Sequence, residues 1–354
     1  SDTMEHEDAI LVRSAKLHDY DFPAELLCIA RAGAGVNNIP LDRAAEAGIV
    51  VFNTPGANAN GVKELTIAAL LLASRKISQG ITWVKEQAAA GADVAAVVEK
   101  GKAAYVGPEI QGKTLGVVGL GAIGVLVANA AAALGMQIVG YDPFLSVQHA
   151  LNLTPGVKVV STLEELYGQA DYISLHLPMT PETKGTLNDA AFAAMKDGVR
   201  IVNLARGELV DTEALKAALA SGKCAAYVTD FPNSETAAME GVVAIPHLGA
   251  STPESEDNCA MMAARQVRDY LDNGNIVNSV NLPVLSMAWA AKNRVCVLTK
   301  GADAAAIAAA VPAVASASKT RGEYGYFLLD TDAQVDTAAI AALPGVLRVR
   351  VLHQ

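Results

Sequence analysis

Short apolar runs alternate with longer stretches of helical composition over most of the chain. Runs such as Ala9–Val12, Leu27–Arg31 and Ile49–Asn53 are rich in Val, Ile and Leu, which is typical of strands buried in a parallel sheet. The segment Val62–Ile77 is hydrophobic nearly all round and predicts a buried helix. This repeated order of strand and helix predicts an α/β protein with doubly wound parallel sheets.

The clearest of these units runs from Thr114 to Asp142. Thr114–Val118 predicts a buried strand, and the glycine-rich turn Gly119–Gly124 follows it at once. Val125–Leu134 then has helix-forming composition, Met136–Tyr141 predicts a second strand, and Asp142 follows that strand. A strand, a glycine turn, a helix, a strand and an acid in this order predict a dinucleotide site.

Each glycine of the turn has a physical role. Gly119 permits the tight bend, Gly121 lets a pyrophosphate approach the backbone, and Gly124 allows the helix to pack closely on the strand. The free N–H groups at the helix start then favour the anion. Asp142 suits the ribose hydroxyls and would repel a 2′-phosphate, so NAD is expected rather than NADP.

Several predicted strands end in a polar residue: Asp142, His176, Arg206, Asp230 and His247. In a doubly wound sheet, ligands bind beyond the carboxyl ends of the strands. These five side chains therefore predict an active site at one edge of the sheet.

Composition narrows the class of protein further. With 354 residues, 52% of them hydrophobic, the chain is long enough for two or three domains. A net charge of −10 argues against nucleic acid and anionic membranes as partners. The four cysteines are far apart, which predicts reduced thiols, no bound metal and a cytoplasmic location, and no apolar run is long enough to predict a membrane span.

The pattern changes near Ser286. Strands are predicted at Arg294–Leu298, Tyr324–Leu329 and Leu347–Leu352, with helices at Asp303–Val311 and Ala338–Leu343. This is a small βαβ-type, ferredoxin-like α+β module. The predicted domains are a substrate domain in two segments, residues 1–61 and 251–285, a Rossmann cofactor domain at 62–250, and the C-terminal module at 286–354.

Several further motifs occur in a characteristic order: VRSAK (12–16), RAGAGVNNI (31–39), NTPG (53–56), GLGAIG (119–124), NLARGELVD (203–211), TDFPNSE (229–235) and PHLGAST (246–252). In these motifs the chain resembles the D-isomer-specific 2-hydroxyacid dehydrogenases. The resemblance implies a flavodoxin-like substrate domain beside the Rossmann domain. It also implies that the C-terminal module is ACT-like.

The resemblance implies a catalytic trio of Arg206, Glu235 and His247. A planar guanidinium can hold the carboxylate and the adjacent oxygen of a 2-hydroxy acid. A histidine takes the alcohol proton as hydride leaves C2. Glu235 would then fix the imidazole and stabilise its charged form.

The remaining site residues are carried over position by position. The expected cofactor contacts are Ala34, Gly119, Gly121, Ala122, Ile123, Gly124, Asp142, His176, Leu177, Pro178, Thr183, Leu204, Ala205, Asp230, Gly249 and Ala250. The expected substrate contacts are Arg13, Lys16, Gly33, Asn53 and Arg206, with Arg13 and Lys16 toward a phosphate. No metal is expected.

The implied reaction is NAD-dependent oxidation of D-3-phosphoglycerate to 3-phosphohydroxypyruvate in L-serine biosynthesis. One alternative is a glyoxylate/hydroxypyruvate reductase or another D-2-hydroxyacid dehydrogenase, and another is a non-catalytic NAD-sensing protein. A homodimer through the cofactor domain, or a tetramer, is implied.

The chain also departs from the family at several positions. Ala122 stands where many relatives have Arg, and the first strand and helix of the family's substrate domain are missing before Val12, so an incomplete substrate domain is expected. In the C-terminal module, Asn293 matches the effector-site asparagine, but Ala291 replaces the usual His, so serine feedback is not carried over.

Overall fold

The structure, a computed structural model, describes residues 6–354 and divides into two compact units. The Rossmann unit is Ala59–Ser255. The split unit combines Ser1–Asn58, of which residues 1–5 lie outside the described part, with Glu256–Gln354. The domain boundaries expected from the sequence remain predictions.

The Rossmann unit is built on a seven-stranded sheet whose paired strands are all parallel. Its spatial order is β10 (Val242–Ala244), β9 (Cys224–Thr229), β8 (Val199–Asn203), β7 (Tyr172–Leu175), β4 (Thr114–Val118), β5 (Gln137–Tyr141) and β6 (Lys158–Val159). The strand order reverses between β4 and β7, and a ligand crevice forms at such a switch point. The α/β fold with a Rossmann-type parallel sheet is therefore confirmed.

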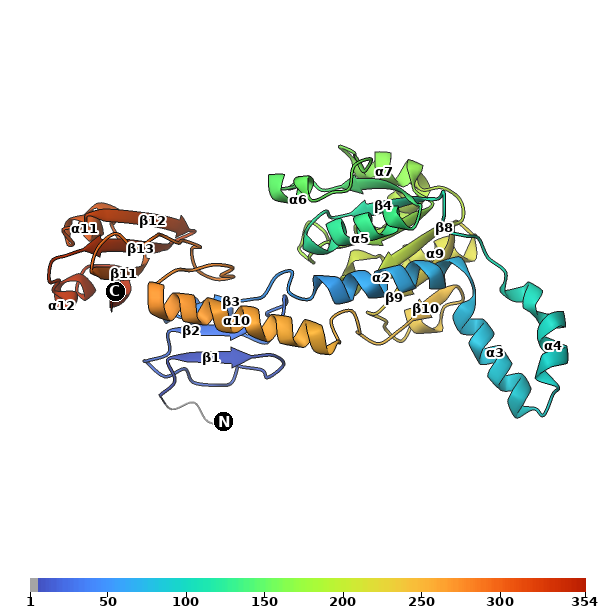
Figure 1. Ribbon diagram of the computed structural model, residues 1–354, viewed down its shortest axis with the longest axis horizontal. Helices are drawn as coiled ribbons and strands as arrows, with labels where there is room; N and C mark the ends of the chain where they lie inside the picture. Colours follow the sequence, from blue (N-terminus) through green and yellow to red (C-terminus); the bar gives the residue numbers. More distant parts are fainter. Residues whose placement is uncertain (1–5) are drawn as a thin grey trace. The chain divides into compact units, whose positions relative to one another are not determined.

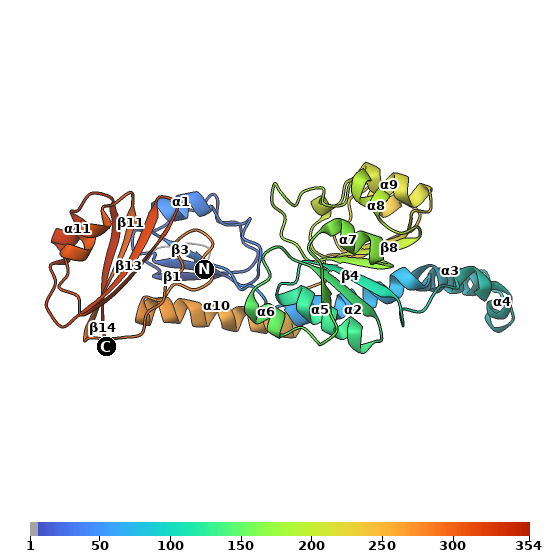
Figure 2. The ribbon, with the colours of Figure 1, turned by 90° about the horizontal axis from the view of Figure 1, so that it is seen from above.

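Helices cover both faces of this sheet (Figure 2). On one face, α2 (Ala59–Ser74) and α5 (Ala122–Ala133) bury Leu70, Val127 and Ala128 against strand residues such as Leu115 and Val117. On the other, α7 (Leu163–Gln169), α8 (Asp189–Ala194) and α9 (Thr212–Ala220) cover the sheet, while the short α6 (Val147–Leu151) follows β5. Because both faces are covered, the central strands are apolar without alternation.

The predicted helix Val62–Ile77 is wrong at both ends. The helix α2 begins at Ala59 and stops at Ser74, whose hydroxyl donates to the Leu70 carbonyl, and α3 (Ile77–Ala89) is a separate helix. Together with α4 (Val94–Gly101) and η1 (Lys102–Tyr105), α3 extends away from the sheet (Figure 1). Neither α3 nor α4 contains a buried residue.

The split unit contains a three-stranded parallel sheet ordered β1 (Ala9–Val12), β2 (Cys28–Arg31) and β3 (Val50–Phe52). The helix α1 (Leu41–Glu46) precedes β3, and the long α10 (Pro253–Asn273) lies almost wholly in this unit. Residues of α10 such as Ala263 and Tyr270 share a core with Cys28 and Phe52.

The C-terminal part forms a four-stranded antiparallel sheet ordered β12 (Ala315–Arg321), β13 (Tyr324–Thr331), β11 (Asn293–Lys300) and β14 (Val346–His353). The helices α11 (Ala304–Ala309) and α12 (Thr337–Ala341) pack on one face. The sequence predicted only three strands here, which is wrong, because β12 adds a fourth and makes the order βαββαβ.

The second face of this antiparallel sheet is also covered. Cys296, Leu298 and Leu328 belong to the same core as Cys28 and Val50 of the parallel sheet. Arg350 of β14 donates to the backbone carbonyls of Tyr270 and Leu271 in α10. The antiparallel sheet and the β1–β3 sheet therefore stabilise each other.

A buried ion pair joins strands β11 and β13 of the antiparallel sheet. Arg294 and Asp330 have fully buried side chains, with Arg294 Nε 2.6 Å from Asp330 Oδ1 and Nη2 2.9 Å from Oδ2. The other guanidinium N–H groups donate to the carbonyls of Asn273, Met287 and Ala288. The pair thus attaches β11 and β13 to the segment that follows α10.

Residues 6–354 include no helix with both the length and the apolar character that crossing a bilayer requires. All four cysteines are buried and none forms a disulfide.

Candidate functional site

The glycine turn after β4 has the geometry that a dinucleotide needs. Gly119 has φ +93°, and a side chain on Gly124 would collide with the Gly119 carbonyl. A Cβ at Gly121 would meet nothing within 4 Å, so the backbone is open there. The helix α5 begins at Ala122 with no side-chain cap, which leaves its first N–H groups for an anion. The residues present fit a pyrophosphate.

Asp142 is fixed beside this turn. Its Oδ2 accepts the Leu120 N–H at 2.8 Å, and its Oδ1 accepts the Phe144 N–H at 2.8 Å. These bonds orient the carboxylate at the end of β5 next to the strand that carries the glycines. The predicted acid therefore contacts the predicted turn directly.

His176 lies against the other side of the turn. Its backbone N–H donates to the Val118 carbonyl at 2.8 Å, and its own carbonyl faces Gly119. The ring Nε2 lies 2.9 Å from the Ser174 hydroxyl, and burial lowers the pKa of His176 to about 4. The imidazole is therefore neutral near pH 7, as suits a residue that lines a cofactor site.

The loop after His176 is held by its own hydrogen bonds. The Thr183 hydroxyl donates to the Pro178 carbonyl at 2.6 Å, and the Leu177 side chain lies beside Gly119. The structure thus places Leu177 next to the glycine turn and joins Thr183 to Pro178. The contact of all three residues with the cofactor remains a prediction.

Arg206 is presented by a turn that a buried amide holds in place. Asn203, at the end of β8, donates to the Arg206 carbonyl at 2.8 Å and accepts the Ala205 N–H at 3.2 Å. The guanidinium donates to the Ala205 carbonyl and lies 5.3 Å from the centre of the Phe231 ring. Within residues 6–354 no carboxylate pairs with Arg206, so its charge is available to an anion.

His247 shares that aromatic ring. It is exposed, follows β10, and its ring centre lies 4.4 Å from the Phe231 ring centre. Phe231 therefore contacts both the guanidinium of Arg206 and the imidazole of His247. Two residues that are far apart in the sequence are brought to one small region at the carboxyl ends of β8, β9 and β10.

Asp230 connects this region to the loop after His247. The carboxylate is 1% exposed, and its Oδ2 accepts the Gly249 N–H at 3.1 Å. Its Oδ1 is buried and has no hydrogen-bond partner among residues 6–354. Burial raises the pKa of Asp230, while the Gly249 N–H and the nearby His247 act in the opposite direction.

Glu235 is placed elsewhere. It is exposed, and its Oε1 lies 3.3 Å from Lys216 Nζ on α9. Asn233 Oδ1 accepts the N–H groups of Glu235 and Thr236, which fixes the backbone before η3 (Thr236–Ala238). The structure does not bring Glu235 into contact with His247, and its catalytic role remains a prediction.

The predicted substrate residues of the split unit lie around β2. Gly33 has φ +148° and its missing side chain leaves room for the Arg31 guanidinium, whose Nε donates to the Arg13 carbonyl at 3.2 Å. Arg13 itself lies 2.6 Å from Glu256 Oε2.

The neighbouring predicted residues are less enclosed. Asn53 Nδ2 donates to the Ala34 carbonyl at 2.8 Å, and Lys16 is exposed. The contacts of these residues with substrate or cofactor remain predictions.

Residues 67–249 match the D-isomer specific 2-hydroxyacid dehydrogenase, NAD binding domain. The chain belongs to the D-isomer-specific 2-hydroxyacid dehydrogenase family. The match to its NAD-binding domain, with the geometry of the turn and Asp142, confirms NAD as the cofactor.

Relatives of the family show how far the similarity extends. The chain is 38% identical over 291 residues to D-3-phosphoglycerate dehydrogenase of Rattus norvegicus, covering 80% of this chain and 52% of the relative. It therefore spans about half the length of that relative.

Solved structures of the family are similar as well. An NAD-bound 3-phosphoglycerate dehydrogenase of Entamoeba histolytica is 32% identical with a TM-score of 0.61, covering 78% of this chain and 83% of that one. D-mandelate dehydrogenase of Rhodotorula graminis is 28% identical with a TM-score of 0.67, covering 78% and 84%.

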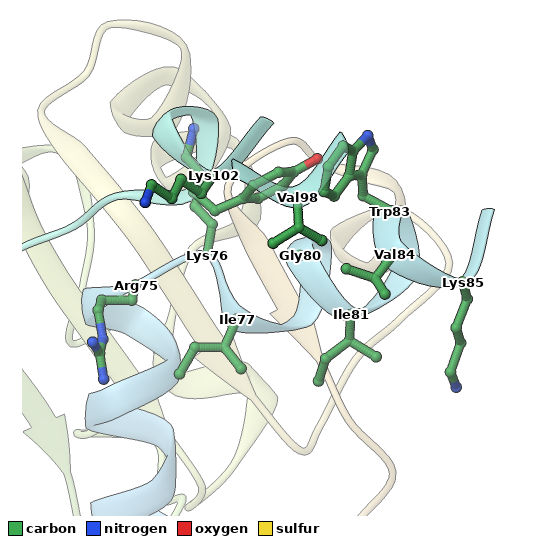
Figure 3. Close-up of a pocket in the computed structure, with 11 residues that line it drawn as sticks. Arg75, Lys76, Ile77, Gly80, Ile81, Trp83, Val84, Lys85, Val98 and Lys102 are labelled. Atoms are coloured by element: carbon green, nitrogen blue, oxygen red, sulfur yellow. The ribbon is translucent and has the colours of Figure 1, made fainter. Parts of the chain in front are cut away.

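A cavity of about 530 Å³ lies between α3, α4 and η1 beside Trp83 and Tyr105 (Figure 3), and its lining contains none of the predicted site residues. Another cavity, of about 370 Å³, is lined by Gly207, Phe231 and Asn233 next to the Arg206 turn.

Sequence reasoning missed Phe231 and Asn203. Phe231 follows Asp230 directly at a strand end, and Asn203 is the last residue of β8 before the Arg206 turn. Only their positions at strand ends could have indicated a role in the site, because neither side chain is titratable. The family motifs contained both residues without indicating their contacts.

Proposed function

We propose that this chain catalyses NAD-dependent oxidation of D-3-phosphoglycerate to 3-phosphohydroxypyruvate, in L-serine biosynthesis. The observation that carries the proposal is the convergence of the unpaired Arg206 and of His247 on the Phe231 ring. The rat and Entamoeba relatives are 3-phosphoglycerate dehydrogenases, and their substrate is the one proposed here.

The chemistry follows from these two side chains. Arg206 holds the substrate carboxylate and the oxygen on C2 through paired N–H bonds. His247 takes the hydroxyl proton as the C2–H bond breaks, and becomes imidazolium. NAD bound at the glycine turn would supply the acceptor for the hydride that leaves C2, and the product would be the 2-keto acid. In the reverse reaction the imidazolium returns the proton to the oxygen.

The phosphate is assigned to cations of the split unit. Arg13 and Lys16 are the residues implied by the family motif, and Arg31 lies beside Arg13. The finer parts of the proposal are a flavodoxin-like substrate domain, an ACT-like C-terminal module and a homodimer through the cofactor domain, or a tetramer. The βαββαβ order of the C-terminal part supports the ACT-like assignment. A cytoplasmic location stays a prediction.

The second candidate is a reductase of glyoxylate or hydroxypyruvate, or another dehydrogenase of D-2-hydroxy acids. One observation favours it: Glu256 already neutralises part of the Arg13 charge. A non-catalytic NAD-binding role stays a further alternative, against which the unpaired Arg206 argues.

A substrate panel tests the proposal. The purified protein is assayed with NAD and NADP on D-3-phosphoglycerate, D-glycerate, D-lactate and D-mandelate. We expect kcat/KM to be highest for the phosphorylated acid with NAD. The substitution R13A should lower that value about tenfold and leave the unphosphorylated acids nearly unchanged, since it removes one half-exposed charge contact. Equal losses on both substrate classes would contradict the phosphate assignment.

A further inference from the structure

We propose that Tyr227 is a positioning residue of this site, because its buried hydroxyl holds the Asn203 amide in the orientation that fixes the turn carrying Arg206. This inference rests on the proposed function, in which Arg206 binds the carboxylate of the acid. It leaves the predicted trio of Arg206, Glu235 and His247 unchanged, and it adds a residue that acts on substrate binding through Arg206.

The contact between Tyr227 and Asn203 follows from the register of two neighbouring strands. Asn203 of β8 pairs with Thr229 of β9, and Tyr227 lies two residues earlier on the same face of β9. The Tyr227 hydroxyl oxygen accepts an N–H of Asn203 Nδ2 at 3.1 Å. Asn203 is fully buried and Tyr227 is 2% exposed, so the protein shields this hydrogen bond from water.

The Asn203 amide connects this hydrogen bond to the turn. Its Oδ1 accepts the Ala205 N–H at 3.2 Å, and its Nδ2 also donates to the Arg206 carbonyl at 2.8 Å. The side-chain amide is planar and carries two N–H donors, so fixing the oxygen and one N–H sets the direction of the other N–H. Without the Tyr227 hydroxyl, one buried N–H of Asn203 would lose its acceptor, and the amide would be held less firmly.

Close packing does not support this turn from every side. Gly207, directly after Arg206, borders the cavity of about 370 Å³, and Tyr227 lines the same cavity. Groups that face a void lack partner atoms on that side and gain less from van der Waals contacts. The Arg206 carbonyl also accepts the Leu209 N–H, at the longer distance of 3.3 Å. Hydrogen bonds, rather than packing alone, are therefore needed to fix the backbone of Arg206.

Tyr227 acts by geometry and not by proton transfer. Burial raises the pKa of Tyr227, while hydrogen bonding by Thr229 and Asn203 acts in the opposite direction. Since the raised value lies above the ordinary value near 10, the phenol stays protonated near pH 7. Its contribution to substrate binding should therefore not depend on pH in that range.

The first test is Y227F, which removes the hydroxyl and keeps the ring in the core. We expect KM for the acid to rise about fivefold, because one buried hydrogen bond that orients Arg206 is lost. The KM for NAD and kcat should change by less than about twofold, since Arg206 holds the carboxylate in the ground state and in the transition state alike. The pH profile of kcat/KM should stay in place.

The matched control is Y172F. Tyr172 is fully buried on β7 of the same sheet, and its hydroxyl lies 2.8 Å from the hydroxyl of Ser74 at the end of α2. Y172F therefore removes a buried, hydrogen-bonded hydroxyl outside the predicted site. We expect Y227F and Y172F to lose similar stability in urea, and KM for the acid to rise in Y227F alone. An equal rise of KM in both variants, or an unchanged KM in Y227F, would overturn the inference.

A double-mutant cycle tests whether Tyr227 acts through Arg206. Once R206M has removed the guanidinium, adding Y227F should change kcat/KM by less than about twofold. A further fivefold loss in R206M/Y227F would show that the hydroxyl acts independently of Arg206, and this result would refute the inference.

A measurement without turnover separates this inference from the proposed function. Phenylglyoxal modifies guanidinium groups, and mass spectrometry of the peptide that contains Arg206 gives the rate of its labelling. We expect this rate to rise about threefold in Y227F, whose turn is held less firmly, and to keep the wild-type value in Y172F. An unchanged rate in Y227F would contradict the role of Tyr227. Failure of the wild type to oxidise any acid in the panel would refute the proposed function and leave this labelling as a valid test.

Discussion

Two charged centres of this molecule differ in how completely they are paired. Arg294 and Asp330 are both fully buried, and the five N–H groups of the guanidinium all have acceptors. Arg206 donates to one backbone carbonyl and lies over a ring, and a buried oxygen of Asp230 has no partner in the part of the chain that the structure describes. All hydrogen-bonding groups of the Arg294 guanidinium are therefore paired within the protein. Arg206 and Asp230 still have hydrogen-bonding groups available to a ligand.

This difference distinguishes charged residues that support the fold from charged residues that bind a ligand. In a fully paired centre such as Arg294–Asp330, desolvation offsets most of the attraction, so the pair affects stability mainly when one partner is removed. A centre with unpaired groups, such as Arg206 and Asp230, lowers stability, and this cost persists where binding or catalysis uses the groups. Substitutions in the two centres should therefore affect different measurements.

The largest effect is expected at the fully paired Arg294 and Asp330. R294M leaves Asp330 buried without its cation, and we expect the free energy of unfolding to fall by about 4 kcal/mol. Urea denaturation measures this, and R294M/D330L should recover a large part of the loss. A single mutant of unchanged stability would show that the pair is not a structural element.

A substitution of Arg206 should change catalytic activity more than stability. R206M removes a guanidinium that pairs with no carboxylate of the described residues, so we expect stability within about 0.5 kcal/mol of the wild type. The two charged hydrogen bonds that we propose between Arg206 and the substrate would be lost, which should lower kcat/KM by more than about 100-fold. Stopped-flow and steady-state assays test this, with thermal denaturation as the control. A large loss of stability with intact kcat/KM would reverse the assignment of the two centres.

The cofactor acid should have an intermediate effect. Asp142 accepts two backbone N–H groups and remains half-buried beside the glycine turn. D142A would remove the predicted repulsion of a 2′-phosphate together with the predicted contact to the ribose, so we expect the preference for NAD over NADP to shrink by about tenfold. The ratio of kcat/KM for the two cofactors measures it, and an unchanged ratio would place the discrimination elsewhere.

The smallest effect is expected at the partly exposed ion pair between Asp171 and Lys196, which serves as a reference for the two charged centres. Partial burial alone would raise the pKa of Asp171, but the Thr114 N–H and Lys196 lower it overall. A lowered folded-state pKa adds stability above the unfolded value near 4, and that stability is lost as the pH falls through the folded value. We expect D171N to cost less than about 1 kcal/mol at pH 7 and nothing near pH 2, by urea denaturation at each pH. A constant difference across this range would contradict the charge mechanism.

The sequence was sufficient where local physics decides the structure. The strand, glycine turn, helix and acid of residues 114–142 are set by backbone sterics and by the period of apolar residues, and the structure shows them as β4, α5 and β5. The alternation of strands and helices likewise predicted the parallel sheet. The C-terminal strand β12 was missed, because its sequence ASASKTR is small and polar, and its pairing with β13 makes it a strand.

The candidate site was predictable in residue type more than in contacts. The strand ends predicted that Arg206 and His247 would lie at one edge of the sheet, and both contact Phe231. No pattern could show that Glu235 pairs with Lys216, because that depends on the Asn233 turn and on the position of α9. The strand ends also predicted Asp230 at this edge, but its hydrogen bond from the Gly249 N–H is known only from the structure.

The shared core of the two sheets in the split unit determines how the chain responds to cleavage. Leu298 and Leu328 are packed with Val50 and Phe52, and Arg348 donates to the carbonyls of Ala24 and Ala47. A protease that nicks the exposed residue Ser286 would therefore yield two fragments that stay associated and elute together until a denaturant separates them.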